Sequence, residues 1–277
     1  MHSKHRFKLT VLALALVTVP AAALADTGSL AAIIQANNEV GIAITGDLTN
    51  YQEHITPGPS DIESGWQPGF AVKGSYMGNP YGLSHVYANV HYARSSGDIA
   101  YLGSLSNGAS YDGTDDAIFN RVMGRLGMGF QVAKAMMATP YLTGGYQSWN
   151  RKLVGPYGYT EDYHAGLIGL GAKFQYAATS RLVLGADAEW MAVIGGSMTP
   201  SDVPGYGDSL GTARFGTTGE EVVGLNADYR IRGPLHLYGG LEFTHFNYTG
   251  GKLNYGASEP LSSTNQFDVD AGIAYSF

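Results

Sequence analysis

Two ionisable residues near the middle of the chain have the types and the spacing of a proton-transfer pair. Asp162 and His164 are separated by Tyr163, so in an extended strand their side chains lie on the same face. A carboxylate beside an imidazole can orient that ring as a general base. The pair is therefore a candidate for hydrolytic chemistry, if other polar groups converge on it.

The remaining histidines do not predict a metal site. His85 and His91 are six residues apart, which is about 20 Å along an extended strand and too far to share one ion. His245 and Glu242 lie on opposite faces of their strand. The chain has no cysteine, which excludes thiolate ligands, thiolate nucleophiles and disulfides. We therefore expect no catalytic residue, no cofactor and no bound metal.

The composition differs from that of a typical soluble domain. Charged residues make up 14% of the chain, against about 25% in soluble domains. Glycine and tyrosine are abundant, with 39 and 19 residues. This balance suits strands that face lipid on one side and crowd together on the other. After residue 25 no run of 18 apolar residues occurs, so no transmembrane helix is expected.

The first 25 residues have the three regions of a secretory signal peptide. Residues 1–8 are basic, Leu9–Val19 is an apolar run, and Ala23-Leu24-Ala25 offers the small residues that signal peptidase requires. We expect export through the Sec pathway and cleavage after Ala25. The rest of the chain has 13 basic and 23 acidic residues, a net charge of −10 with neutral histidines. This acidic balance argues against binding to nucleic acid.

The chain after residue 37 has the pattern of about ten β-strands, although eight or twelve also fit. The predicted strands are 38–51, 66–77, 82–94, 115–132, 139–150, 162–176, 182–194, 219–231, 235–248 and 265–277. Short connections alternate with longer ones rich in Gly, Ser, Asp, Asn and Tyr, which are 52–65, 95–114, 151–161, 195–218 and 249–264. This alternation is typical of an up-and-down antiparallel barrel in a membrane.

Apolar and polar residues occupy opposite faces of most predicted strands, which two kinds of barrel could explain. A soluble lipocalin-like barrel places the apolar face inside, whereas a membrane barrel places it outside. Glycines on the polar face and aromatic residues near the strand ends favour the membrane barrel. The aromatic residues expected to form two outward girdles are Tyr51, Trp66, Tyr92, Trp149 and Trp190 at one end and Tyr76, Phe130, Phe174, Tyr176, Tyr229 and Phe277 at the other.

In a membrane barrel the polar face lines the lumen, and its charges have both signs. Ten strands leave a narrow interior in which unpaired charges are costly, so we expect the charges to pair across the lumen. The predicted charge network comprises Asp47, Lys73, Arg121, Arg125, Lys173, Asp187, Glu189, Asp228, Arg230, Glu242, Asp268 and Asp270. A narrow polar conduit for ions or small solutes is the alternative.

The last strand favours one class of barrel over the others. Phe267, Ile273, Tyr275 and Phe277 share one face, and the chain ends on the aromatic residue. An exported chain of this kind resembles the small outer-membrane β-barrel proteins of Gram-negative bacteria, of the OmpA-like or opacity type. The resemblance implies an all-β transmembrane barrel over 38–277, after a short periplasmic segment, 26–37, that contains a small helix. It also implies that Tyr275 and Phe277 are recognised by the barrel-assembly machinery.

The resemblance leaves the activity open. Ten-stranded outer-membrane barrels include the omptin endopeptidases, which use two acidic residues facing an Asp-His pair at the outer rim. This chain departs from that pattern, because Asp162 and His164 are not adjacent and its Asp-x-Asp motif, at Asp268 and Asp270, lies on the final strand. A lipid-A-modifying hydrolase, with a Ser/His site, is a second enzyme class without a matching motif here.

We therefore expect a non-enzymatic outer-membrane protein with a largely closed lumen and a structural or adhesin-like role. Its expected partners are outer-membrane lipid, lipopolysaccharide and a host or cell-surface ligand. The predicted loops carry residues suited to such contacts, namely Ser95, Tyr101, Tyr111, Tyr206, Phe215 and Tyr255. The narrow pore and the hydrolase remain the alternatives.

Overall fold

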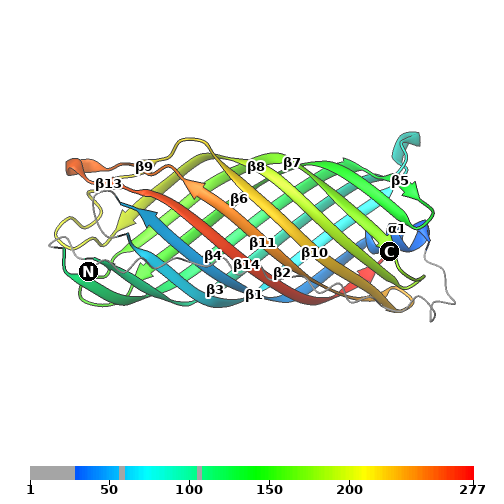
Figure 1. Cartoon of the computed structure of the whole chain (residues 1–277), viewed down its shortest axis with the longest axis horizontal. Helices are drawn as coiled ribbons and strands as arrows, with labels where there is room; N and C mark the ends of the chain where they lie inside the picture. Colours follow the sequence, from blue (N-terminus) through cyan, green and yellow to red (C-terminus); the bar gives the residue numbers. More distant parts are fainter. Residues whose placement is uncertain (1–28, 56–59, 105–107) are drawn as a thin grey trace, which may run out of the picture.

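The computed structural model describes residues 29–55, 60–104 and 108–277, which form one β-barrel (Figure 1). The predicted signal peptide lies outside the described residues. The elements in chain order are α1 (Leu30–Ala36), β1 (Glu39–His54), β2 (Ile62–Gly78), η2 (Pro80–Gly82), β3 (Val86–Ser104), β4 (Ser110–Met128), β5 (Phe130–Ala133), β6 (Met136–Leu153), β7 (Thr160–Ala177), β8 (Leu182–Ser201), β9 (Ala213–Arg214), β10 (Thr218–Arg232), β11 (Leu235–Tyr248), β12 (Gly251–Lys252), η3 (Asn254–Gly256), β13 (Ser258–Glu259) and β14 (Leu261–Ser276). Among the described helices, none has the length and hydropathy needed to cross a membrane.

The first and last long strands pair with each other and close the barrel. β1 pairs with β2 on one side and with β14 on the other, with Ile42 opposite Ile273. All the other long strands pair antiparallel with their neighbours in the chain, including β8 with β10. The barrel therefore has ten strands and an up-and-down order, as predicted.

The exterior is apolar and the lumen is polar, as the alternation predicts. On β1, Ile44 is 75% exposed whereas Asp47 is 2% exposed. Leu225 and Ile273 also face outward, and Glu189 faces inward. An apolar belt with a charged interior has the polarity of a membrane barrel, so the lipocalin-like alternative is wrong.

The strands are longer than predicted at the end of the barrel opposite α1. β3 and β4 continue through most of 95–114, and β8 continues to Ser201, so much of the predicted loops 95–114 and 195–218 is strand. Strands of about 18 residues rise about 60 Å, which exceeds an apolar band of about 25 Å even when tilted by 45°. Above the lipid an outward side chain need not be apolar. The apolar alternation therefore stops while the backbone pairing continues.

Two residues predicted in the aromatic girdle lie inside the barrel. Tyr51 and Trp149 are each 1% exposed, whereas Trp66 and Trp190 are about half exposed on the outer surface. Strand parity explains the error, because Tyr51 shares the inward face of Asp47. The aromatic residues predicted at the other end, including Phe130 and Phe277, do face outward.

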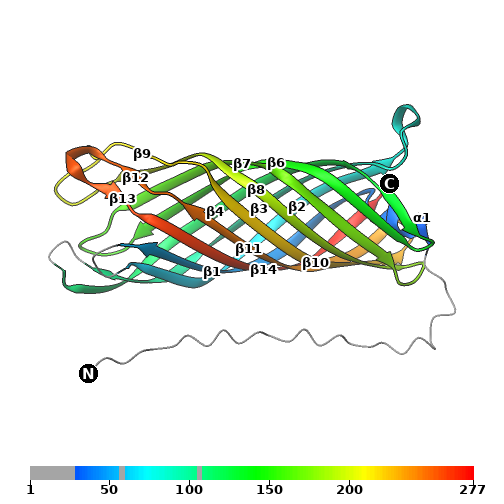
Figure 2. The ribbon, with the colours of Figure 1, turned by 45° about the horizontal axis from the view of Figure 1, so that its top comes forward.

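The helix and the carboxy terminus lie at one end of the barrel, and β9, β12 and β13 lie at the other (Figures 1 and 2). The end that carries α1 is called the periplasmic end, and the opposite end is the extracellular mouth. Helix α1 falls within the predicted periplasmic segment 26–37.

Candidate functional site

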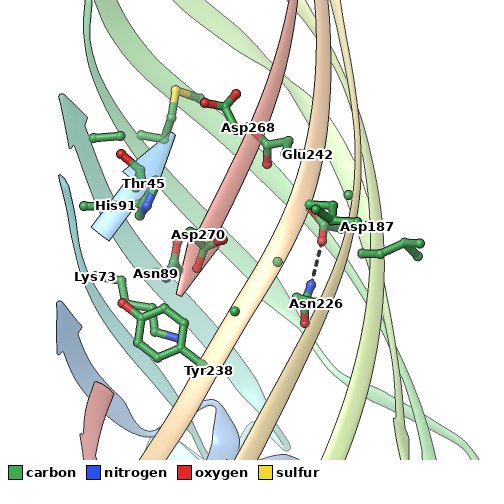
Figure 3. Close-up of a pocket in the computed structure, with 18 of the residues that line it drawn as sticks. Thr45, Lys73, Asn89, His91, Asp187, Asn226, Tyr238, Glu242, Asp268 and Asp270 are labelled. Carbon is green, nitrogen blue, oxygen red and sulfur yellow. Dashed lines mark hydrogen bonds between the residues drawn. The ribbon is translucent and has the colours of Figure 1, made fainter. Parts of the chain in front are cut away.

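A cavity of about 220 Å³ lies in the lumen between the two ends of the barrel. It extends from Ala36 and Glu39 near the periplasmic end to Thr244 and Gln266 near the mouth. Figure 3 shows Asp187, Glu242, Asp268 and Asp270 converging on it, with Asp187 accepting a hydrogen bond from Asn226. The barrel strands place these groups together because alternate residues of every strand point inward.

Three basic residues of the predicted network form ion pairs in the lumen. Lys73 lies 2.6 Å from Glu39, and its ammonium also lies over the ring of Tyr238. Arg121 pairs with Glu220, and Arg125 pairs with Glu189. Of these acids, only Glu189 was in the predicted network. Glu220 lies at an inward position of β10 and is fully buried in the lumen.

Several acids of the predicted network have no ion pair. Among the described residues, Glu242, Asp268 and Asp270 have no basic partner within 4 Å. Asp47 is held instead by neutral groups, since it accepts hydrogen bonds from Thr49, Ser95 and Gln266. The cavity therefore has an acidic wall, and the predicted pairing of all the lumen charges is incomplete.

The other predicted network residues lie near the periplasmic end. Lys173 donates a hydrogen bond to Asn37, and Arg230 donates to Gln35, so both bind the helical segment. Asp228 contacts His236 instead, at 2.6 Å. These contacts attach the helix and the strands around it to one another.

Helix α1 packs against β2, β6, β7 and β8 at the periplasmic end of the barrel. Ile33 is fully buried, and it belongs to an apolar cluster with Met77, Tyr87, Met137 and Tyr141. The Nδ2 atom of Asn37 also donates a 2.7 Å hydrogen bond to Gln175 Oε1. We call α1 the plug helix, because its buried side chains Ala32, Ile33 and Ala36 belong to the cluster at the periplasmic end of the barrel.

A second cluster of buried side chains lies near the mouth. The guanidinium of Arg151 binds Glu63, Glu161 and the hydroxyl of Tyr163, and it is 2% exposed. The rings of Tyr51, Trp149 and Tyr163 face the guanidinium. These three rings belong to a larger buried group, which we call the mouth cluster: Tyr51, Phe119, Trp149, Tyr163, Phe215, Phe246 and Tyr248. Leu253, from the β12–β13 loop, packs against the cluster from outside.

The mouth has more acids than bases around Arg151. Glu259 of β13 is 5% exposed and accepts a 2.6 Å hydrogen bond from Tyr163. Burial, together with the neighbouring Glu161 and Glu53 carboxylates, holds the pKa of Glu259 well above its usual value. Burial also raises the pKa of Asp61, although a hydrogen bond from Tyr101 opposes the shift. Sequence alone did not predict this cluster, because its members come from distant strands.

The candidate proton-transfer pair lies on the outside of the barrel. Asp162 and His164 share a face, as predicted, but the inward positions of β7 are Glu161 and Tyr163. Asp162 accepts a 2.5 Å hydrogen bond from Asn150, and the Nδ1 atom of His164 lies 2.8 Å from the hydroxyl of Tyr146. The carboxylate therefore does not orient the imidazole, and neither residue lines the cavity in the lumen.

Comparisons with solved structures find the same fold in outer-membrane proteins. The chain is similar to the outer membrane protease OmpT from Escherichia coli, with a TM-score of 0.55, 11% identity and coverage of 87% of this chain and 97% of that one. It is also similar to the transport unit of the autotransporter AIDA-I from Escherichia coli, with a TM-score of 0.50, 12% identity and coverage of 86% and 90%. At these identities the likeness shows the fold alone. No protein-family model and no curated protein matches the sequence.

Proposed function

We propose that this protein is an integral outer-membrane barrel that acts at the cell surface as a structural or adhesive element, and not as a pore or an enzyme. The fold shared with outer-membrane proteins and the apolar belt support the location. Among the described residues, the side chains that line the lumen do not form a recognisable catalytic site. The function is therefore assigned to the extracellular surface.

The observation that carries this proposal is that a buried side-chain cluster lies at each end of the lumen cavity, one around the plug helix and one at the mouth. We infer that each cluster acts as a seal, so that two seals lie in series along the lumen. An ion that crosses the barrel must pass both. Because resistances in series add, opening one seal leaves the other to block conduction.

Planar-bilayer recording of the refolded protein tests the closed lumen. We expect no steady conductance from the unmodified protein. Deletion of Leu30–Ala36, or the pair of substitutions Trp149→Ala and Phe246→Ala, should each leave the barrel closed. The variant that combines them should conduct, with a preference for cations because the cavity wall is acidic. Steady conductance from the unmodified barrel would support the narrow pore instead.

The surface role is supported by an exposed aromatic pair at the mouth. Tyr206 and Tyr255 come from different loops, and their ring centroids are 5.7 Å apart. They are 51% and 73% exposed. Tyr255 also has a φ of 57°, a backbone conformation that disfavours a tyrosine. Exposed aromatic rings held in place by a rigid scaffold are typical contact residues. Ser95, Tyr101 and Phe215, in contrast, are buried and cannot serve as the predicted contact residues.

An autoaggregation assay tests this surface role. Cells that display the protein should sediment faster than cells that lack it, and the double substitution Tyr206→Ser and Tyr255→Ser should reduce the difference. Tyr81→Ser is the matched control, because Tyr81 is fully exposed with a φ of 53° but lies in the turn at the opposite end. Equal sedimentation of the double variant and the unmodified protein would remove Tyr206 and Tyr255 from the proposal without affecting the closed lumen.

A further inference from the structure

Three buried side chains with metal-binding chemistry meet beside the plug helix. They are Glu39 at the start of β1, Asp228 on β10 and His236 on β11. Each offers one ligand atom, and the three atoms lie within 4.8 Å of one another. Glu39, Asp228 and His236 are 1%, 8% and 2% exposed, so the cluster is buried and differs from a chance group of acidic side chains on the surface.

The strand register explains why residues so distant in the chain meet. Within the β10–β11 hairpin, His236 pairs with Arg230, which places it diagonally across from Asp228. On its other side His236 pairs with Ala274 of β14, and Gly41 of β1 pairs with the same alanine. Glu39 therefore reaches the site from the far side of β14, and closure of the barrel is required to assemble it.

Each of the three side chains has a buried polar atom without a hydrogen-bond partner. The atoms are Glu39 Oε2, Asp228 Oδ2 and His236 Nε2. A buried polar atom without a partner is costly, and three such atoms in one cluster are a reason to look for a missing ligand. Asp228 Oδ1 lies 2.6 Å from His236 Nδ1, and Glu39 Oε2 lies 3.9 Å from the same nitrogen. One hydrogen bond therefore does not satisfy the cluster.

We propose that Glu39, Asp228 and His236 bind a divalent transition-metal ion, with Zn²⁺ as the best match. One imidazole nitrogen and two carboxylate oxygens suit Zn²⁺, whereas Ca²⁺ and Mg²⁺ prefer oxygen ligands throughout. Tetrahedral Zn²⁺ places its ligand atoms about 3.4 Å apart. Binding would therefore shorten the 3.9 Å distance from Glu39 Oε2 to His236 Nδ1 and replace the 2.6 Å hydrogen bond between Asp228 Oδ1 and His236 Nδ1 with bonds from both side chains to the ion. Glu39 and Asp228 also line the cavity, which supplies space for a water as the fourth ligand.

The positive charge of Lys73 disfavours a cation at this site, but its position leaves one carboxylate oxygen of Glu39 available. Its ammonium binds Glu39 Oε1, which leaves Oε2 for the ion and orients the carboxylate. The ammonium also lies 3.4 Å from the centroid of the Tyr238 ring, a cation–π contact that holds it on the side of Oε1. Two carboxylates and one ammonium leave the cluster with one net negative charge when His236 is neutral. A divalent cation is therefore still attracted.

Metal binding to refolded protein without a histidine tag tests this site. Titration with ZnCl₂ after treatment with EDTA should give one ion per barrel. His236→Gln should weaken binding by roughly tenfold or more. His91→Gln is the matched control, because His91 also lines the cavity but is not part of the cluster, and it should bind Zn²⁺ as the unmodified protein does.

Two further measurements keep the test decisive if His236→Gln fails to fold. Co²⁺ added to the unmodified protein should give the visible absorption of a tetrahedral site, and Zn²⁺ should remove it. Glu39→Gln and Asp228→Asn should each weaken binding, with folding checked by heat-modifiable gel migration. Absence of a stoichiometric ion in the unmodified barrel, or full affinity in all three variants, would overturn the proposal.

Discussion

Replacement of Arg151 by methionine should destabilise the barrel more than any exposed substitution. The guanidinium contacts Glu63, Glu161 and Tyr163, and Arg151 lies over the rings of Tyr51 and Trp149. Methionine keeps part of the packing but removes the charge. Glu63 and Glu161, which are 3% and 9% exposed, then lose their cationic partner while they remain buried.

The size of this effect follows from the burial of the ion pairs. Removal of one member of a buried ion pair costs about 3–5 kcal/mol, because the other charge stays desolvated without compensation. Replacement of the whole network by neutral groups is often close to neutral. The triple variant Arg151→Met, Glu63→Gln and Glu161→Gln should therefore recover most of the loss.

Urea unfolding of the refolded barrel, followed by gel mobility and by tryptophan fluorescence, measures both changes. Arg94→Met is the matched control, because Arg94 donates a hydrogen bond to Asn120 but forms no described ion pair. It should change the free energy of unfolding by less than about 1 kcal/mol. An Arg151→Met barrel as stable as the control, or a triple variant no more stable than Arg151→Met, would refute this account of the mouth cluster.

Three other perturbations have expected outcomes. Gly171→Ala should cost about 1–3 kcal/mol in urea unfolding, because the new Cβ would lie 2.6 Å from the Tyr141 ring, while Gly124→Ala, with 3.8 Å of clearance, should cost less than about 1 kcal/mol. Because the pKa of Glu259 is raised in the folded protein, the packed β12–β13 loop favours the protonated carboxyl. The loop is therefore most stable below about pH 4, and it loses stability as the pH rises through the raised pKa of Glu259. Glu259→Gln should therefore slow hydrogen exchange of 251–259 at pH 8 and leave it unchanged at pH 4; equal rates at pH 8 would contradict this. Phe277→Ala should lower the yield of folded barrel in cells without lowering the stability of the protein once folded, whereas an unchanged yield would remove Phe277 as an assembly signal.

The sequence predicted the barrel because its main signal is local. The alternation of side chains along a strand has a period of two, so Asp187 and Glu189 are assigned to one face and Leu184 to the other without knowledge of any partner strand. The same logic predicted the inward acids and the outward terminal aromatic residues. For Tyr51 and Trp149 the expected outward girdle was wrong, because the alternation in β1 and β6 places both residues on the inward face.

Tertiary structure decided which inward residues meet, because that depends on the register and closure of ten strands. Arg151 on β6 reaches Glu63 on β2, and Glu39 approaches His236 across β14; no spacing along the chain encodes either contact. The plug helix was expected as a helix, but only the barrel provides the apolar cluster that receives Ile33. The face on which a residue lies is a property of its own strand, whereas its partner is a property of the closed sheet.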